Sequence, residues 1–119
     1  MLSIEEAIQR SNFDDVEEFI DNESSEIHTD DVWFWRKKES VCEILAGCQI
    51  DEIEAVFVEI VHRMLLAGGI PEDEFTRQAL PVIQAGQSLS AREFAAKLVR
   101  YQLHHARYGE CGRGIWFAK

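Results

Sequence analysis

The feature that most constrains this chain is an amphipathic stretch at residues 51–67. Apolar residues recur there at the spacing i, i+3, i+4 and i+7, which places them along one side of an α-helix. Gly68 and Gly69 follow directly and suit the end of that helix. A helix with one continuous apolar stripe needs other elements to cover it. The stretch therefore predicts a mainly helical protein around a central helix with the core residues Ile53, Val56, Phe57, Ile60, Val61, Met64 and Leu65.

Capping patterns predict further helices on both sides of the central one. A serine followed three residues later by an acid marks a helix start, and this pattern begins at Ser3, Ser11, Ser40 and Ser90. Residues 3–21 are expected to form an acidic pair of short helices, and residues 90–108 the last helix. Residues 6–16 resemble one helix-turn-helix unit of an ankyrin-type repeat, but the roughly 33-residue period of such repeats does not recur downstream.

The remaining segments complete the expected architecture. Residues 21–31 are polar and acidic, which is typical of a loop, and a helix start is placed at Thr29 or Asp30. Pro71 is placed at the first position of a helix that runs through residues 75–80 and breaks near Pro81. The apolar tail at residues 109–119 is expected to dock as a short extended segment. The predicted fold is all-α, a single-domain bundle of five to six helices over residues 1–119.

Length and composition agree with one globular domain. The chain has 119 residues, 46% of them hydrophobic, which is enough for a single core. No apolar run approaches the roughly 18–20 residues that cross a bilayer, and the first residues lack the basic start of a secretion signal. A cytoplasmic location is expected. The three cysteines, Cys42, Cys48 and Cys111, form an odd set without a disulfide framework, so reduced thiols are expected.

Charge is distributed unevenly along the chain. The formal net charge is −10, and residues 1–31 contain eleven acids and one base, Arg10. Residues 92–119 have the opposite balance, with six bases and two acids. A negative front third favours encounter with a basic partner and disfavours direct binding of nucleic acid, whose phosphates need a basic face.

Aromatic residues follow the acidic stretch immediately, at Trp33, Phe34 and Trp35. A helical period buries at most two or three residues of such a run together with Val32, so at least one aromatic side chain is expected to be partly exposed. Exposed tryptophans next to acids are typical of the anchors at a protein interface.

Patterns for catalysis and for metal sites are weak. The sequence has no nucleophile elbow, no phosphate-binding loop and no Cys-x-x-Cys pair, so no catalytic residue, cofactor or metal ligand is assigned. An EF-hand at residues 21–32 fails because its sixth and twelfth positions are Glu26 and Val32. His104, His105 and Cys111 leave one alternative open, a small zinc-dependent enzyme.

These observations favour a small acidic protein-binding module. The sharpest hypothesis is a bacterial immunity or inhibitor protein that covers the basic surface of a cognate toxin, such as a nuclease; this is an analogy of class and not a match to a motif. A secretion chaperone or regulatory adaptor is the other alternative, and the sequence does not decide between monomer and dimer. The residues expected to contact the partner are Asp14, Asp15, Glu17, Glu18, Asp21, Glu23, Glu26, Asp30, Asp31, Trp33 and Trp35.

Overall fold

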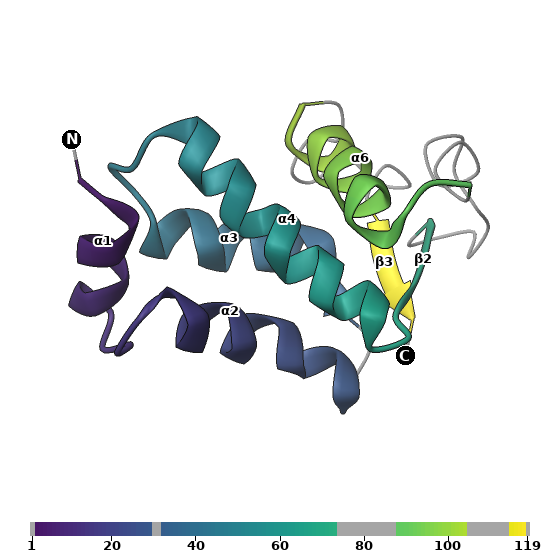
Figure 1. Ribbon diagram of the computed structural model, residues 1–119, viewed down its shortest axis with the longest axis horizontal. Coiled ribbons are helices and arrows are strands. Elements are labelled where there is room, and N and C mark those ends of the chain that lie inside the picture. Colours follow the sequence, from purple (N-terminus) through teal and green to yellow (C-terminus); the bar gives the residue numbers. More distant parts are fainter. Residues whose placement is uncertain (1, 30–31, 74–87, 105–114, 119) are drawn as a thin grey trace.

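Helices account for most of the structure, a computed structural model that describes residues 2–29, 32–73, 88–104 and 115–118 (Figure 1). The predicted all-α class is confirmed, with a small sheet added to the helices. Five α-helices, one 3-10 helix and three short strands are found among the described residues. In chain order they are α1 (Ile4–Arg10), α2 (Val16–Ser24), η1 (Ser25–His28), β1 (Val32–Trp33), α3 (Phe34–Ile44), α4 (Ile50–Leu66), β2 (Ile70–Asp73), α6 (Ala91–His104) and β3 (Ile115–Ala118).

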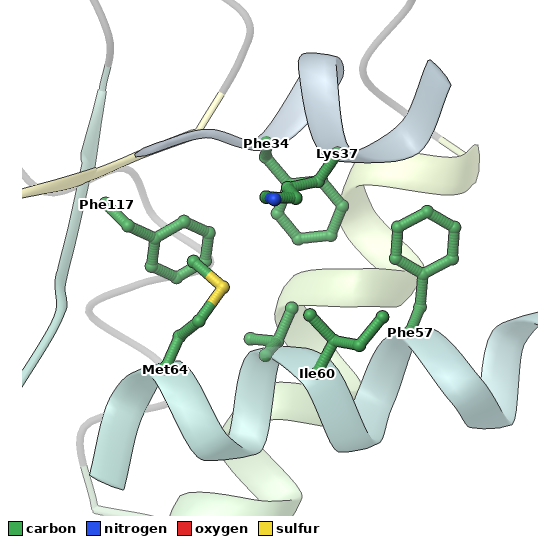
Figure 2. A pocket seen from close by; sticks show the side chains of 7 residues that line it. Phe34, Lys37, Phe57, Ile60, Met64 and Phe117 are labelled. Carbon is green, nitrogen blue, oxygen red and sulfur yellow. The ribbon is translucent and has the colours of Figure 1, made fainter. Parts of the chain in front are cut away.

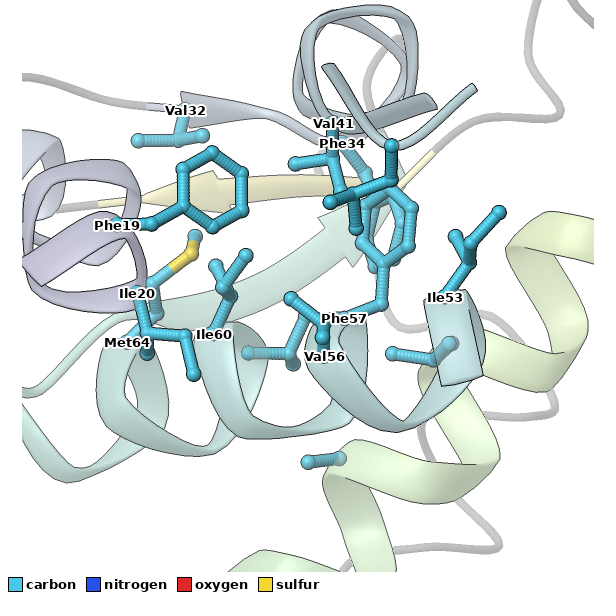
Figure 3. Packing of buried hydrophobic residues seen from close by; sticks show 14 of the residues in the cluster. Phe19, Ile20, Val32, Phe34, Val41, Ile53, Val56, Phe57, Ile60 and Met64 are labelled. Atoms are coloured by element: carbon cyan, nitrogen blue, oxygen red, sulfur yellow. The ribbon is translucent and has the colours of Figure 1, made fainter. Parts of the chain in front are cut away.

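Helix α4 is the centre of the fold, as its amphipathic pattern predicts. It packs against α2, α3 and α6, and its stripe residues Phe57, Ile60, Val61 and Met64 are buried (Figure 3). The apolar stripe is therefore covered on several sides, and burial of each large side chain contributes about 1.5–3 kcal/mol. Leu65, at the edge of the stripe, is only partly buried.

An aromatic cluster joins α4 to α3 and to the end of the chain. The ring centroid of Phe34 lies 5.8 Å from that of Phe57 in a stacked arrangement and 5.7 Å from that of Phe117. All three side chains are at most 1% exposed. Ring pairs at this separation add stabilisation beyond their buried area. Phe34, from the predicted aromatic run, thus enters the core.

The sheet has the order β1-β3-β2, and both pairings are antiparallel. Phe117 of β3 lies opposite Val32 on one side and Pro71 on the other. The expected extended C-terminal segment is therefore present at Ile115–Ala118 as the central strand, whereas residues 109–114 and 119 lie outside the described residues. The sheet covers the end of the core at which α4 finishes (Figure 1).

The predicted helix start at Pro71 is wrong, because Ile70–Asp73 forms strand β2. The residues after Asp73 that were expected to continue this helix, 74–87, lie outside the described residues. Strand β2 is at the edge of the sheet, where proline is tolerated because its missing N–H need not join a ladder. Pairing with β3, which is more than forty residues away along the chain, outweighs the local preference for a helix start.

The helix start predicted at Ser11 is also misplaced. The N–H groups of Asn12 and Phe13 donate to the carbonyl oxygens of Gln9 and Ile8, and Asn12 has a φ of 68°. These bonds form a Schellman motif that ends α1, so Ser11 belongs to the end of the first helix. Helix α2 begins after Asp15 instead.

Two further boundaries differ from the prediction. Residues 21–28 are not a loop, since α2 continues to Ser24 and η1 follows to His28. Helix α3 starts at Phe34, directly after β1, so Ser40 lies inside the helix and does not cap it. The Ser40 hydroxyl instead donates a hydrogen bond to Glu23 of α2. Contacts between helices therefore outweigh the local capping pattern at this position.

Candidate protein-binding surface

The first two helices position their acids through helix capping. The Ser3 hydroxyl accepts a hydrogen bond from the Glu6 N–H at 3.2 Å and donates to the Glu6 carboxylate at 3.0 Å. The Asp15 carboxylate accepts from the Glu18 N–H at 2.8 Å, and the Glu18 carboxylate accepts from the Asp14 N–H at 2.8 Å. Carboxylates are favoured at helix N-termini because they satisfy free N–H groups and face the positive end of the dipole.

The fold brings acids from a third helix to the same end of the molecule. The Leu2 N–H donates to the Gly47 carbonyl at 3.3 Å, and the Cys48 thiol lies 3.6 Å from the Ser3 carbonyl oxygen. The start of α1 therefore lies against the loop that precedes α4. Figure 1 shows α1 and the first turns of α2 and α4 at the end away from the sheet. We define the acidic end by its seven exposed acids: Glu5, Glu6, Asp14, Asp15, Glu18, Asp51 and Glu52.

Burial and acids from two helices of the acidic end raise the pKa of the Cys48 thiol. Burial raises the pKa of its thiol, and the negative charges of Glu52, Glu6 and Glu5 raise it further. Acids of α1 and α4 thus act on the same sulfur atom. Asp51 and Glu52 stand at the start of the predicted central helix and are not among the predicted contact residues. They join the acidic end because the start of the chain contacts the loop between α3 and α4. The periodicity of the sequence carries no information about that contact.

The seven carboxylates of the acidic end lack ion pairs with lysine, arginine or histidine within the described part of the chain. Their charge is consequently open to solvent and to a partner. Of the predicted contact residues, Asp14, Asp15 and Glu18 belong to this group.

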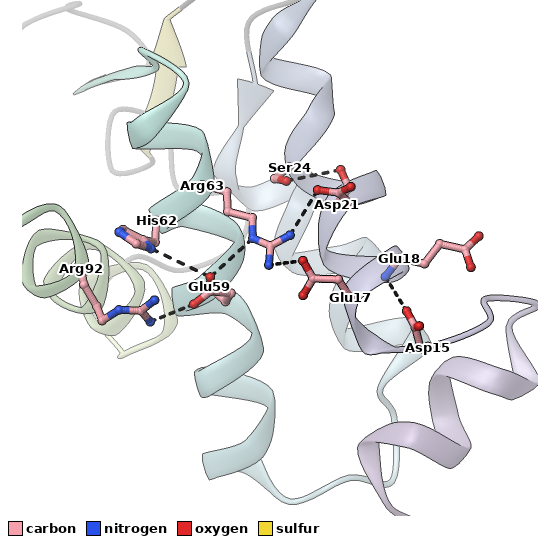
Figure 4. A network of polar contacts seen from close by, with 9 residues as sticks. All are labelled: Asp15, Glu17, Glu18, Asp21, Ser24, Glu59, His62, Arg63 and Arg92. Atoms are coloured by element: carbon pink, nitrogen blue, oxygen red, sulfur yellow. Dashed lines mark hydrogen bonds and ion pairs between the residues drawn. The ribbon is translucent and has the colours of Figure 1, made fainter.

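Glu17 and Asp21 are exposed but already paired within the chain. The Arg63 guanidinium reaches across from α4 and contacts Glu17 through Nη2 and Asp21 through Nη1, the latter at 3.1 Å (Figure 4). Its Nε lies 3.4 Å from Glu59 Oε1, and Glu59 Oε2 lies 2.8 Å from Arg92 Nη1. A continuous ionic network therefore connects α2, α4 and α6.

The network shifts the pKa of its central groups. Burial alone raises the pKa of Glu59 and lowers that of Arg63. Hydrogen bonds and charge outweigh burial in both cases: Arg92 and Arg63 bring the Glu59 pKa below its usual value, and Glu17 and Glu59 bring the Arg63 pKa above its usual value. Both groups are held in their charged forms.

Glu23 does not belong to an exposed surface, contrary to the prediction. Glu23 is only 6% exposed. Its carboxylate lies 3.0 Å from Lys37 Nζ and accepts a 3.4 Å hydrogen bond from the Ser40 hydroxyl. Lys37 also pairs with the exposed Glu26 at 2.7 Å. A buried charge needs such partners, so Glu23 joins α2 to α3 as part of the structure.

The other predicted contact residues are placed only in part. Asp30 and Asp31 lie outside the described residues. Trp33 lies in β1 opposite Trp116 of β3, and Trp35 lies in the first turn of α3. The side chains of these tryptophans are not among those that the structure describes, so their role as anchors stays a prediction.

An apolar space behind Lys37 is packing and not a ligand site. Aromatic and aliphatic side chains of α3, α4 and β3 surround it (Figure 2), and they leave no room for a water molecule. The lining residues are Phe34, Lys37, Phe57, Ile60, Val61, Met64 and Phe117.

Metal-ligating side chains do not gather in the described part of the chain, where no group of three or more histidine, cysteine or acidic residues could hold an ion. The predicted alternative of a zinc site involves His104, His105 and Cys111. His105 and Cys111 lie outside the described residues, and the side chain of His104 is not among those that the structure describes. Cys42 and Cys48 are free thiols, partly buried and packed against the core. The Nδ1 atom of His62 lies 3.9 Å from Glu59 Oε1.

No helix of the described residues is both long enough and apolar enough to cross a bilayer. Comparison with known proteins gave no match to a family model, to a curated protein or to a solved structure.

Proposed function

We propose that this protein binds a basic protein through its acidic end. The observation that carries the proposal is the set of seven exposed carboxylates that three helix starts bring together without ion-paired cations in the described part of the chain. Such a surface accelerates encounter with a positively charged partner, because long-range attraction acts before contact.

The specific form of the proposal is an immunity or inhibitor protein for a bacterial toxin, with a basic nuclease domain as the leading type of target. A nuclease binds phosphates through lysine and arginine, and carboxylates at the acidic end would imitate those phosphates. Inhibition would follow from occlusion of the basic surface. The net charge of −10 supports this form.

The test reverses charge and keeps every N-cap residue. Glu5→Lys with Asp14→Lys changes two acids whose carboxylates neither cap a helix nor form an ion pair with described residues. The control, Glu39→Lys with Glu93→Lys, changes net charge equally on α3 and α6. It removes the carboxylate that accepts from the Ser90 hydroxyl, but Ser90 still accepts from the N–H of residue 93. The wild-type protein is immobilised, and its partner is captured at low salt from a lysate of cells that carry the gene. The association rate of the Glu5/Asp14 variant should fall about tenfold or more, and its salt dependence should flatten, relative to the Glu39/Glu93 control.

Equal rates for the two variants would contradict the proposal. Capture of an apolar or unfolded client without salt dependence would favour the secretion chaperone or adaptor. Stoichiometric zinc in elemental analysis would favour the zinc-dependent enzyme.

A further inference from the structure

Two exposed acids of α2 outside the acidic end already contact a guanidinium group within the chain. Glu17 and Asp21 lie four residues apart on α2, and the two terminal nitrogens of Arg63 each contact one of them (Figure 4). The side chains of Glu17 and Asp21 are 69% and 77% exposed, whereas that of Arg63 is 25% exposed. Arg63 thus approaches from the α4 side and leaves the outer side of both carboxylates open.

Another cation could replace Arg63 at Glu17 and Asp21. Each ionised carboxylate has about four acceptor positions, and ion pairs between exposed groups are individually weak. Arg63 would not be left unpaired after losing Glu17 and Asp21, because its Nε lies 3.4 Å from Glu59. Glu59 is itself held by Arg92 at 2.8 Å, so its position does not depend on Arg63 alone.

We propose that the binding surface extends from the acidic end along α2 to Glu17 and Asp21, where Arg63 is an internal competitor, and that an arginine of the partner displaces Arg63 from these two carboxylates. This inference rests on the proposed function, since it presumes a basic partner. It specifies the partner chemistry as guanidinium, because a planar fork of N–H donors suits two carboxylates one helical turn apart better than the point charge of lysine.

The first experiment compares Arg63→Gln with Arg92→Gln. Both variants lose one positive charge, but Arg92 contacts Glu59 and not the exposed acids of α2. Binding of a nona-arginine peptide, measured by fluorescence anisotropy, should tighten about threefold to tenfold in Arg63→Gln, as expected for the release of exposed ion pairs. It should tighten less than about twofold in Arg92→Gln. Equal tightening in the two variants would overturn the proposal, because net charge alone would then explain it.

A second comparison needs no change at Arg63 and decides the question if Arg63→Gln fails to fold. Glu17→Gln with Asp21→Asn removes two acids that Arg63 already contacts, and Glu5→Gln with Asp14→Asn removes two acids of the acidic end. The Glu17/Asp21 variant should lose less affinity for nona-arginine than the Glu5/Asp14 variant. A larger loss in the Glu17/Asp21 variant would show that Arg63 does not compete.

The two proposals fail separately. If the captured protein ignores the Glu5/Asp14 reversal while the peptide still separates Arg63→Gln from Arg92→Gln, the proposed function is wrong, and only the competition between Arg63 and free arginine side chains stands. If the captured protein responds to the reversal but the peptide does not separate the two variants, the competition is wrong and the proposed function stands.

Discussion

Adjacent glycines after α4 have different roles at the residue scale. The N–H groups of Gly68 and Gly69 donate to the carbonyl oxygens of Leu65 and Met64, which forms a Schellman motif. Gly68 has a φ of +96° and open space around its Cα. A Cβ on Gly69 would lie 2.9 Å from the Met64 carbonyl oxygen and 3.1 Å from Ile27. Gly68 therefore supplies a backbone conformation, and Gly69 supplies a close approach between the end of α4 and η1.

Alanine substitutions separate these roles. Gly68→Ala should lower the free energy of unfolding by about 1 kcal/mol, because an L-residue is strained in the left-handed region. Gly69→Ala should cost about 2 kcal/mol or more, because the backbone of α4 or Ile27 must shift. Urea unfolding followed by circular dichroism measures both, and a smaller cost at Gly69 than at Gly68 would refute this assignment.

At the scale of elements, polar contacts add to the apolar packing that holds α4 against its neighbours. Glu59 lies between Arg63 on its own helix and Arg92 on α6, and Arg63 extends the network to α2. Lys37 and Glu23 connect α2 to α3 in a similar way. Because apolar contacts are non-directional, such pairs help to set the relative orientation of helices whose stripes would also pack in other ways.

The Glu59 network predicts a pH-dependent effect. The folded-state pKa of Glu59 lies below the usual value of a glutamate, so its contribution to stability is present above that usual value and is lost as pH falls through the folded pKa. Glu59→Gln should therefore lower stability by about 0.5–1 kcal/mol near neutral pH, and this loss should shrink as pH falls through the folded pKa of the carboxyl. Thermal unfolding from neutral pH to the lowest pH at which the protein stays folded measures this. A loss that does not change with pH would mean that the carboxylate charge is not what stabilises the network.

At the scale of the whole molecule, the end of the chain closes the core. Strand β3 lies between β1 and β2, and Phe117 is fully buried against Phe34. The sheet thus joins three segments that are far apart in sequence. The acidic end lies at the opposite side of the helices (Figure 1), so the surface proposed for binding and the closing strand are separate.

Removal of the Phe117 ring should therefore affect the entire fold. Phe117→Ala should cost about 3–5 kcal/mol through lost burial and the cavity that remains. Leu66→Ala, at a side chain that is 67% exposed, is the matched control and should change stability by less than about 0.5 kcal/mol. Denaturant unfolding measures both variants. A small effect of Phe117→Ala would mean that the helices form their core without β3.

Local patterns in the sequence predict much of this protein but not its boundaries or its surface. The stripe of α4 and the caps at Ser3 and Ser90 depend on residues three or four positions apart, and the structure contains them as expected. The start of α2 was misplaced because the Schellman motif at Asn12 uses Ser11 for the end of α1. Strand β2 does not follow from the local pattern, because Pro71 and the three acids at 72–74 imitate a helix start.

The sequence alone therefore determined the helical class, the central helix and the concentration of acids at helix starts, since helix periodicity and capping act within one or two turns. Tertiary structure decided which acids are available to a partner. Glu23 is buried by Lys37, Glu17 and Asp21 are paired with Arg63, and Glu52 joins the acids of α1. The reason is that charge pairing and burial depend on distances in space between residues that lie tens of positions apart along the chain.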